Sequence, residues 1–112
     1  MNFARAYINY DGHRAGAATL NIFDHLQPPR TVIATLFIKP EYRGLGLGTK
    51  LLNRCITKSV GDWIFVKVDK GRASGFSLRK WYKRHGFKGY VGYDNDILIL
   101  DKRIATSTTW TT

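Results

Sequence analysis

Three glycines alternate in the segment RGLGLG, from Arg43 to Gly48, and the sequence on either side of them narrows the possible folds. Thr31 to Ile38 (TVIATLFI) is an almost unbroken apolar and β-branched run, which predicts a central strand covered on both faces. From Leu47 onward apolar residues recur at helical spacing, which predicts an amphipathic helix of about 13 residues that ends near Gly61. A glycine-rich turn between a buried strand and a helix is typical of an α/β fold.

The rest of the chain alternates between strand and helix patterns. Asp62–Asp69 (DWIFVKVD) is a second buried strand, and the order strand, helix, strand predicts a parallel crossover. A second helix is expected to be capped by Ser74 and to end at Gly86. Asp11-Gly12 and Asp94-Asn95 are expected to form hairpin turns. The other predicted elements are strands Phe3–Tyr10, Ala15–Phe23, Phe87–Tyr93 and Asp96–Arg103 and a loop over Asp24–Arg30.

Size and composition predict one globular domain. The chain has 112 residues, of which 44% are hydrophobic, enough for one core and too few residues for two. We expect the domain to span 1–104 and a polar tail to span 105–112. The single cysteine, Cys55, excludes an internal disulfide and a cysteine-based metal cluster, which favours the cytoplasm. No apolar run approaches the roughly 20 residues that cross a bilayer, so we expect no membrane association. We also expect no metal site.

The glycine segment favours binding of a phosphate-containing ligand. Glycines allow the backbone to approach a ligand closely, and amides at a helix N-terminus bind oxygen anions. The net charge of +10 also attracts anions. A P-loop is excluded because Thr49 separates Gly48 from Lys50. The dinucleotide fingerprint is the weaker alternative, since the spacing is G-x-G-x-G although Asp69 follows about 20 residues on.

Two motifs resemble those of one family. Arg43–Gly48 matches the pattern [R/Q]-x-x-G-x-[G/A], and Leu36–Tyr42 matches the usual lead-in. Trp81–Phe87 (WYKRHGF) is similar to an aromatic-Tyr-x-Lys-x-Gly-Phe block downstream. The chain therefore resembles the GNAT superfamily of acetyl-CoA-dependent N-acetyltransferases from about Phe3 to Arg103. The usual N-terminal strand and helical pair are missing, which implies an open acceptor side.

The resemblance implies a fold, a cosubstrate and roles for particular residues. The fold would be a single α/β domain whose mixed, mostly antiparallel sheet has a central parallel pair splayed around CoA. In the reaction, an amine would attack acetyl-CoA directly, and this amine would belong to a protein, a peptide or another large substrate. Tyr82 would protonate the departing thiolate, and the amide of Ile38 would face the thioester oxygen. Leu36, Phe37 and Ile38 would pair with the pantetheine arm, and Arg43, Gly44, Leu45, Gly46, Leu47, Gly48 and Thr49 would hold the diphosphate.

The sequence departs from the family in two places. Position 75 is Gly, where many members have an Asn that contacts pantetheine. The predicted central strand has no carboxylate to act as general base. The base therefore stays open between His13, Asp24, His25 and a water chain.

Several candidate residues also have an ordinary structural interpretation. Tyr82 shares an apolar helical face with Leu78 and Trp81, so packing is its alternative role. Cys55 lies in the buried stripe of the first helix, which favours core packing over nucleophilic work. His85 directly precedes the glycine that ends the second helix and is expected to be a C-terminal cap rather than an acid or base.

A basic stretch from Lys67 to Lys88 suggests further anionic partners. The structural alternative is a solvated face. In the functional interpretation some of these cations flank the adenosine 3′-phosphate of CoA and the remainder bind nucleic acid or an acidic protein, two roles that are compatible. The alternative function is thus a non-catalytic basic module that binds CoA, nucleic acid or both, with a nucleotide-binding regulator as a third hypothesis. The stretch comprises Lys67, Lys70, Arg72, Arg79, Lys80, Lys83, Arg84 and Lys88, interleaved with Phe76, Trp81 and Tyr82.

Overall fold

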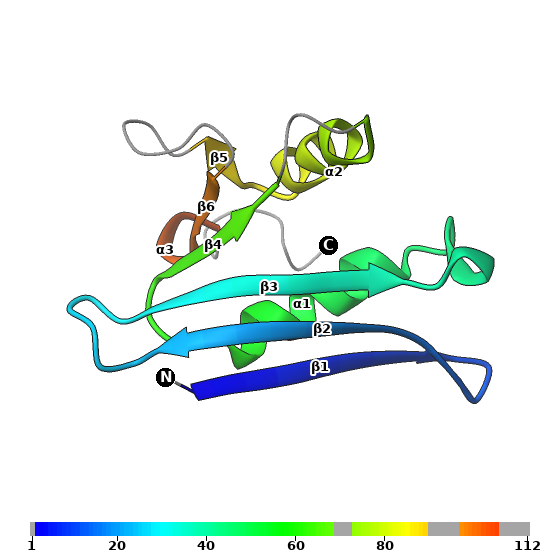
Figure 1. The fold of residues 1–112 in the computed structure, drawn as a ribbon, viewed down its shortest axis with the longest axis horizontal. Coiled ribbons are helices and arrows are strands. Elements are labelled where there is room, and N and C mark those ends of the chain that lie inside the picture. The colour runs from blue at the N-terminus through cyan, green and yellow to red at the C-terminus, as the bar shows by residue number, and fades with distance from the viewer. Residues whose placement is uncertain (1, 69–72, 90–96, 106–112) are drawn as a thin grey trace.

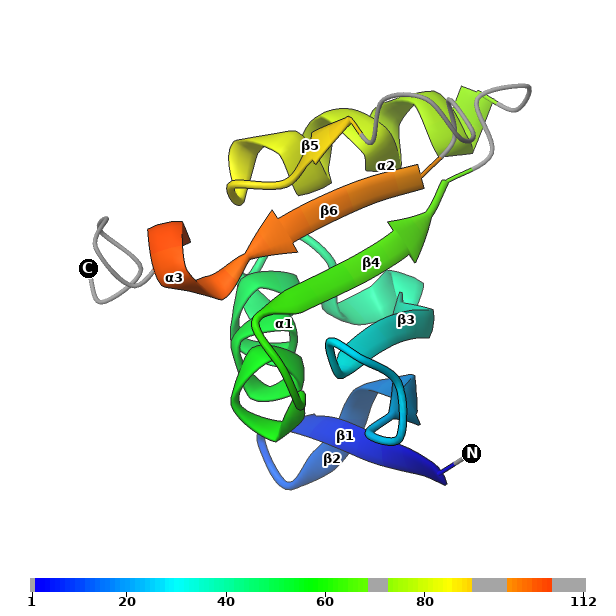
Figure 2. The same cartoon turned by 90° about the vertical axis from the view of Figure 1, so that its left-hand side faces the viewer.

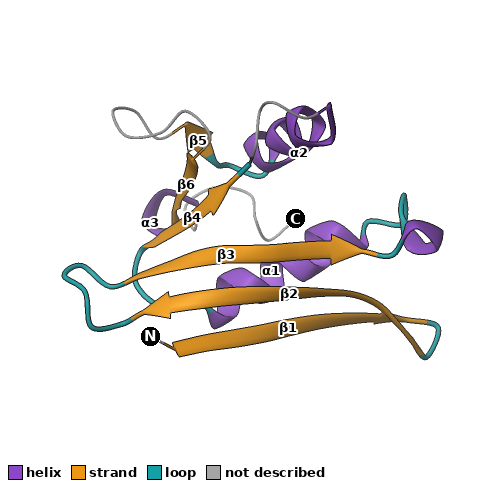
Figure 3. Cartoon of the chain, viewed as in Figure 1, coloured by secondary structure: helices purple, strands orange, loops and turns teal. Residues whose placement is uncertain are grey.

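A computed structural model describes residues 2–68, 73–89 and 97–105 (Figures 1 and 3). The strands are β1 (Asn2–Tyr10), β2 (His13–Phe23), β3 (Arg30–Ile38), β4 (Trp63–Lys67), β5 (Lys88–Gly89) and β6 (Ile97–Asp101). The helical elements are the 3-10 turn η1 (Pro40–Tyr42), α1 (Leu47–Lys58), α2 (Ala73–Arg84) and α3 (Lys102–Ala105). The strands form one sheet in the order β1-β2-β3-β4-β6-β5. Among the described strands only β3 and β4 pair in parallel, which confirms the predicted α/β fold with a mixed, mostly antiparallel sheet.

The first hairpin forms as the sequence predicts. Asp11 (φ 52°) and Gly12 (φ 79°) both adopt left-handed conformations, as a two-residue type I′ turn requires. Two side chains of α1 (Leu47–Lys58) partly cover the outer edge of β1. Arg54 and Lys58 donate side-chain hydrogen bonds to the backbone carbonyls of Tyr7 and Arg5, which occupies acceptors that an edge strand otherwise exposes.

Helix α1 fills the main core. It contacts β1, β2 and β3 and lies behind these strands in Figure 1. Its buried stripe consists of Leu47, Leu51, Leu52 and Cys55, as its apolar spacing predicts. The sheet contributes Ala6, Ile8, Ala18, Leu20, Ile33, Ile64, Val66, Leu98 and Leu100 to the same core.

Helix α2 ends in a Schellman motif, which confirms Gly86 as its C-terminal glycine. The amide of Gly86 (φ 95°) donates to the Lys83 carbonyl over 3.1 Å, and the amide of Phe87 donates to the Tyr82 carbonyl over 3.2 Å. This pair of bonds satisfies two carbonyls that the helix end leaves free. Figure 2 shows α2 running behind β5 and β6.

Two predicted helix boundaries are wrong. Helix α1 ends at Lys58 and its C-cap, Ser59, is extended, so Gly61 does not cap it. Gly61 has φ 75°, and a Cβ added there would lie 2.0 Å from the Pro29 carbonyl oxygen, so it is a glycine because two loops meet. Helix α2 already begins at Ala73, which places Ser74 inside the first turn rather than at the cap.

The prediction for the central strand is half right. β3 does lie between β2 and β4, but Ala34, Thr35 and Phe37 are exposed. The strand is therefore not covered on both faces, because α1 covers one face and no described helix lies over the other (Figure 3).

The C-terminal prediction is also partly wrong. Lys102 and Arg103 begin α3 rather than extend the strand. The predicted Asp94-Asn95 turn, most of the strand Phe87–Tyr93 and almost all of the predicted tail lie outside the described residues. Among the described residues no helix is long and apolar enough to cross a membrane.

Candidate functional site

The two parallel strands stay together for only four residues. Arg30–Ile33 pairs with Trp63–Val66, and β3 then continues to Ile38 beside β2. A register shift in the β2–β3 ladder leaves Ala34 without a partner at the same point, and such a bulge bends a strand. Figure 1 shows β3 and β4 diverging from there. The second half of β3 thus has one edge that β4 does not cover.

The backbone groups of Leu36 and Ile38 point into this gap. The amide of Lys39 donates to the Ala15 carbonyl over 2.8 Å, which marks a hydrogen-bonded pair in the β2–β3 ladder. Because such pairs alternate with non-hydrogen-bonded ones, Phe37 exchanges its backbone bonds with β2 while those of Leu36 and Ile38 face away from it. Of Leu36, Phe37 and Ile38, the first and last therefore have backbone groups that β2 does not use.

The glycine segment follows this open edge, and its glycines are needed for different reasons. Gly44 (φ 83°) and Gly46 (φ 76°) are left-handed, with open space where a Cβ would project, so the backbone conformation alone favours glycine there. Gly48 lies within α1, where an added Cβ would be 3.2 Å from the ring of Trp81 on α2. Gly48 therefore allows the two helices to approach each other.

The N-terminus of α1 presents backbone donors at the end of this segment. Gly46 is the N-cap and provides no side-chain hydrogen bond. The amide of Lys50 donates to the Gly46 carbonyl over 3.4 Å, so the amides of Leu47, Gly48 and Thr49 precede the first carbonyl partner inside the helix. These amides and the positive end of the helix dipole are suited to a phosphate group.

Arg43 connects the glycine segment to the open strand. Its Nε donates to the Ile38 carbonyl over 3.0 Å, and its guanidinium lies 5.3 Å from the centre of the Phe37 ring. One of the two outward-facing carbonyls of β3 is thereby satisfied by the side chain of the motif. The side chain of Leu45, two residues after Arg43, is exposed.

Sequence reasoning missed a side-chain link between α1 and α2. His85 Nδ1 lies 2.8 Å from the Trp81 carbonyl, which only accepts, so this nitrogen carries a proton and His85 caps α2 as predicted. His85 Nε2 lies 2.8 Å from Thr49 Oγ1, and in the neutral ring it accepts the hydroxyl proton. The contact joins residues 36 positions apart, which no local sequence pattern indicates.

Tyr82 lies in the hydrophobic core, where it is 1% exposed. Its ring makes edge contacts with Trp81 at 5.0 Å and Phe87 at 5.1 Å, so the packing role foreseen for it is real. Burial raises the pKa of the phenol far above its usual value, and the nearby Cys55 adds to the effect. The phenol is therefore protonated at every physiological pH and can act only as a hydrogen donor or neutral acceptor.

Cys55 has no nucleophilic character. Its thiol is buried in the α1 stripe, and burial raises its pKa to about 11 despite the opposing charge of Lys58. The thiolate is scarce near neutral pH, which confirms core packing as its role.

The three side chains considered as general base lie at opposite ends of the sheet. Asp24 and His25 follow the end of β2 that pairs with Arg30, about 25 Å of strand from Ile38. They are too far from the open end of β3 to serve there. His13 begins β2, just beyond the Gly16–Ile38 pair, and is the one candidate at the right end.

The basic stretch is largely exposed where it is described. The side chains of Lys67, Lys80, Lys83, Arg84 and Lys88 are exposed, and Arg79 is half-buried. One guanidinium nitrogen of Arg79 is buried without a hydrogen-bond partner among the described residues. Lys70 and Arg72 lie outside the described residues, as does the side chain of Phe76.

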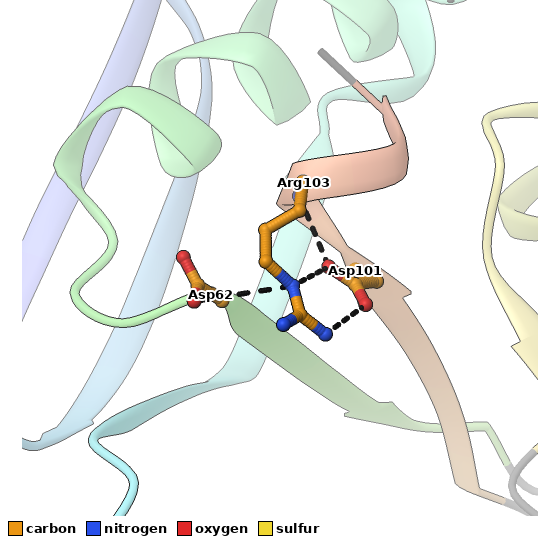
Figure 4. Close-up of polar contacts among 3 residues, drawn as sticks. All are labelled: Asp62, Asp101 and Arg103. Carbon is orange, nitrogen blue, oxygen red and sulfur yellow. Dashed lines mark hydrogen bonds and ion pairs between the residues drawn. The ribbon is translucent and has the colours of Figure 1, made fainter. Parts of the chain in front are cut away.

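A separate polar cluster holds the closed end of the parallel pair (Figure 4). Arg103 Nε and Nη2 donate to the two oxygens of Asp101 over 3.0 and 2.8 Å, and Asp62 Oδ2 lies 4.0 Å from the same Nε. The hydrogen bonds from Arg103 lower the pKa of Asp101 to about 2. This cluster ties the end of β6 to the start of β4, at the end of that strand remote from the gap.

Comparison with known proteins assigns these features to one family. A sequence model described as the acetyltransferase (GNAT) family matches residues 2–87. The PaiA N-acetyltransferase of Thermoplasma acidophilum in complex with coenzyme A superposes with a TM-score of 0.69 at 22% identity, over 90% of this chain and 62% of that one. AtaTR bound with AcCoA gives 0.66 at 18% identity over 90% and 67%, and the KacTA–DNA complex gives 0.70 at 19% identity over 98% and 74%.

These structural likenesses show the fold. The chain spans 62 to 74% of the length of the three structures. No curated protein matches the chain in sequence.

Proposed function

The chain belongs to the acetyltransferase (GNAT) family, and from that premise we propose that it transfers an acetyl group from acetyl-CoA to an amine. One observation carries the proposal. The open edge of β3 begins where β4 parts from it, and the glycine segment and the N-terminus of α1 follow at the far end of that edge. An elongated ligand with a diphosphate at one end and an amide-containing arm matches these donors in order.

The diphosphate is assigned to the glycine segment. The amide of Arg43 already donates to the Pro40 carbonyl over 3.2 Å, so the amides of residues 44–49 are the donors that we assign to the anion, and the left-handed Gly44 and Gly46 give the loop its curvature. The exposed cations of α2 offer additional positive charge for the 3′-phosphate.

The pantetheine arm is assigned to the uncovered edge of β3. Its amides can pair with the backbone groups of Leu36 and Ile38 as an added strand would. The Ile38 carbonyl is already bonded to Arg43, so the Ile38 amide is the free group at the end of the strand. We assign it to the thioester oxygen, where a fixed donor stabilises the charge that develops during attack.

The reaction proceeds by direct displacement. The amine nitrogen forms a bond to the thioester carbon, the carbon–sulfur bond breaks, and the nitrogen gives up one proton to a base or to water as the amide forms, while the departing CoA thiolate gains one proton. Tyr82 is assigned as the donor to the departing thiolate. Because its pKa is raised by burial, it supplies a hydrogen bond as the negative charge develops and retains its own proton until the thiolate has formed.

No carboxylate in β3 can remove the proton of the amine. Of the side chains considered as base, His13 is the one that begins β2 near the open end of β3, which supports it as the candidate. If His13 does not act as the base, we propose that the acceptor binds as the uncharged amine. This amine belongs to a protein, peptide or other large molecule. Turnover should then rise with pH until the acceptor amine itself is deprotonated.

Calorimetry with acetyl-CoA and a thiol-release assay over a panel of amines test the proposal together. We expect micromolar binding and release of free CoA with at least one amine. Gly46→Asp should weaken acetyl-CoA binding at least tenfold, because it places a carboxylate beside the diphosphate. Gly12→Asp is the matched control, since it makes the same change at a left-handed glycine with open space, in the β1–β2 turn. Equal affinities of the two variants would contradict the assignment of the loop.

The second candidate is a basic module that binds CoA, nucleic acid or both without turnover. The absence of a carboxylate from β3 and the presence of glycine at position 75 favour it. Acetyl-CoA binding without release of thiol over the whole amine panel would support this module, and turnover would exclude it.

A further inference from the structure

The face of the sheet opposite α1 carries exposed aromatic rings. Helix α1 contacts β1, β2 and β3, and in Figure 3 no described helix lies in front of these three strands. Tyr7, Ala17 and Phe37 pair across the strands, so their side chains point to the same face. Phe3 shares this face by alternation along β1. The exposed fractions are 65% for Phe3, 38% for Tyr7 and 53% for Phe37.

Arginines accompany these rings. The guanidinium of Arg14 lies 4.0 Å from the centre of the Tyr7 ring and donates to Asn9 Oδ1 over 3.1 Å, while Arg43 lies over Phe37. Arg5 is exposed between Phe3 and Tyr7. β1, β2 and β3 contain no Asp or Glu. We call this surface the outer face, defined by Phe3, Tyr7 and Phe37 with Arg5, Arg14 and Arg43.

The spacing of the rings suits flat, separated groups. Phe3 and Tyr7 are four residues apart, about 13 Å along the strand, and Tyr7 and Phe37 are two strands apart, about 10 Å across the sheet. Ala17 lies between the rings of Tyr7 and Phe37, and its small side chain leaves space between them. Planar bases can therefore lie on or between the rings while the phosphates reach the guanidinium groups.

We propose that the outer face binds single-stranded nucleic acid by base stacking. A duplex hides the faces of its bases, whereas a single strand offers both stackable rings and phosphates. A second copy of the chain is disfavoured on this face, because each copy carries +10 and the three strands offer no carboxylate to pair with the arginines. This binding goes beyond the proposed acyl transfer and uses a surface other than the basic stretch on α2.

The test is titration of fluorescein-labelled 12-residue oligouridylate and oligothymidylate in the absence of acetyl-CoA, with a duplex of equal phosphate number for comparison. Both single strands should bind more tightly than the duplex, and their ratio distinguishes RNA from DNA as the natural ligand. Tyr7→Ala and Phe3→Ala should each weaken binding by roughly five- to a hundredfold, with unchanged salt dependence, because each removes a stacking ring. Having two such variants guards against a folding defect in either one.

Arg14→Ala should reduce the slope of log affinity against log salt by about 0.7, the contribution of one phosphate contact. Lys83→Ala on α2 removes the same charge elsewhere and is its matched control. Losses confined to Lys83→Ala would overturn the proposal and favour the α2 stretch. Duplex binding as tight as single-strand binding would also overturn the proposal. It would be overturned too if a poly-glutamate peptide bound as tightly as the single strands and lost affinity in Tyr7→Ala. Because the assay contains no acetyl-CoA, this proposal and the acyltransferase proposal can fail independently.

Discussion

The sheet has a long half and a short half that are built differently. β1, β2 and β3 have 9, 11 and 9 residues and share one helix, α1, whose buried stripe covers them. β4, β6 and β5 have 5, 5 and 2 residues. The long half carries the open strand edge and the glycine segment, and the short half supplies Tyr82, Trp81 and His85 where the two halves meet.

This difference suggests a division of labour. The donors that we assign to the diphosphate and the pantetheine arm belong to β3, its following loop and α1. The group that we assign to the leaving thiolate belongs to α2. Damage to the long half should therefore impair binding, whereas loss of the Tyr82 hydroxyl on α2 should impair turnover, and the contacts between α1 and α2 should affect both.

Gly61→Ala should have the largest effect on stability. Gly61 is left-handed and an added Cβ would lie 2.0 Å from the Pro29 carbonyl oxygen, so the turn between α1 and β4 would have to move. We expect a loss of about 3 kcal/mol, from the left-handed strain and the clash together. Gly12→Ala is the control for strain without a clash and should cost about 1 kcal/mol. Urea unfolding measures both, and equal losses would show that the contact with Pro29 is not limiting.

Tyr82→Phe tests the contribution of the short half to the reaction. It retains the edge contacts with Trp81 and Phe87 but removes the hydroxyl, so kcat should fall about 100-fold while acetyl-CoA affinity barely changes. Because burial raises the pKa of Tyr82 far above neutrality, the wild-type rate should not decline up to about pH 9. An unchanged kcat in the variant would remove Tyr82 from the mechanism and leave it a packing residue.

Thr49→Val and His85→Ala test the link between the halves. Their 2.8 Å contact should give a coupling of about 1 kcal/mol in a double-mutant cycle of unfolding free energies. Each single variant should also raise the KM for acetyl-CoA more than it lowers kcat, because the first turn of α1 loses a support. Additive effects of the two changes would show that the contact carries no coupling.

Arg103→Ala should have the smallest effect and affects only the closed end of the parallel pair. Removal of the hydrogen bonds should raise the pKa of Asp101 from about 2 toward its usual value near 3.9. A carboxyl group whose pKa is lower in the folded state stabilises the fold at pH values above its unfolded pKa. This stabilisation is lost as the pH falls through its folded pKa. The variant should therefore unfold at a slightly higher pH on acidification, without loss of acetyl-CoA binding. Carboxyl NMR titration measures the pKa, and Arg103→Lys should recover part of the shift.

The sequence was sufficient for local features. Asp11-Gly12 specifies its hairpin turn, the apolar spacing from Leu47 specifies the buried stripe of α1, and Gly86 specifies the end of α2. In each case the determining groups lie within a few residues of each other. The glycine segment and the Trp81–Phe87 block are equally local, which is why the family could be identified from the chain alone.

Tertiary structure decided the features that depend on distant partners. β3 reads as a fully buried strand, yet α1 covers only one of its faces, and Ala34, Thr35 and Phe37 are exposed. Gly61 reads as a helix cap, but the carbonyl of Pro29 determines its role. Asp24 and His25 read as candidate bases, until the register of β2 places them about 25 Å from Ile38.

Sequence by itself thus determined which segments form strands, helices and turns, because backbone propensity and apolar periodicity act over short ranges. The fold alone decided which backbone edge stays uncovered, which side chains meet across α1 and α2, and which rings share the outer face. These depend on strand register and on where two strands part, and both are set by packing between residues far apart in the chain.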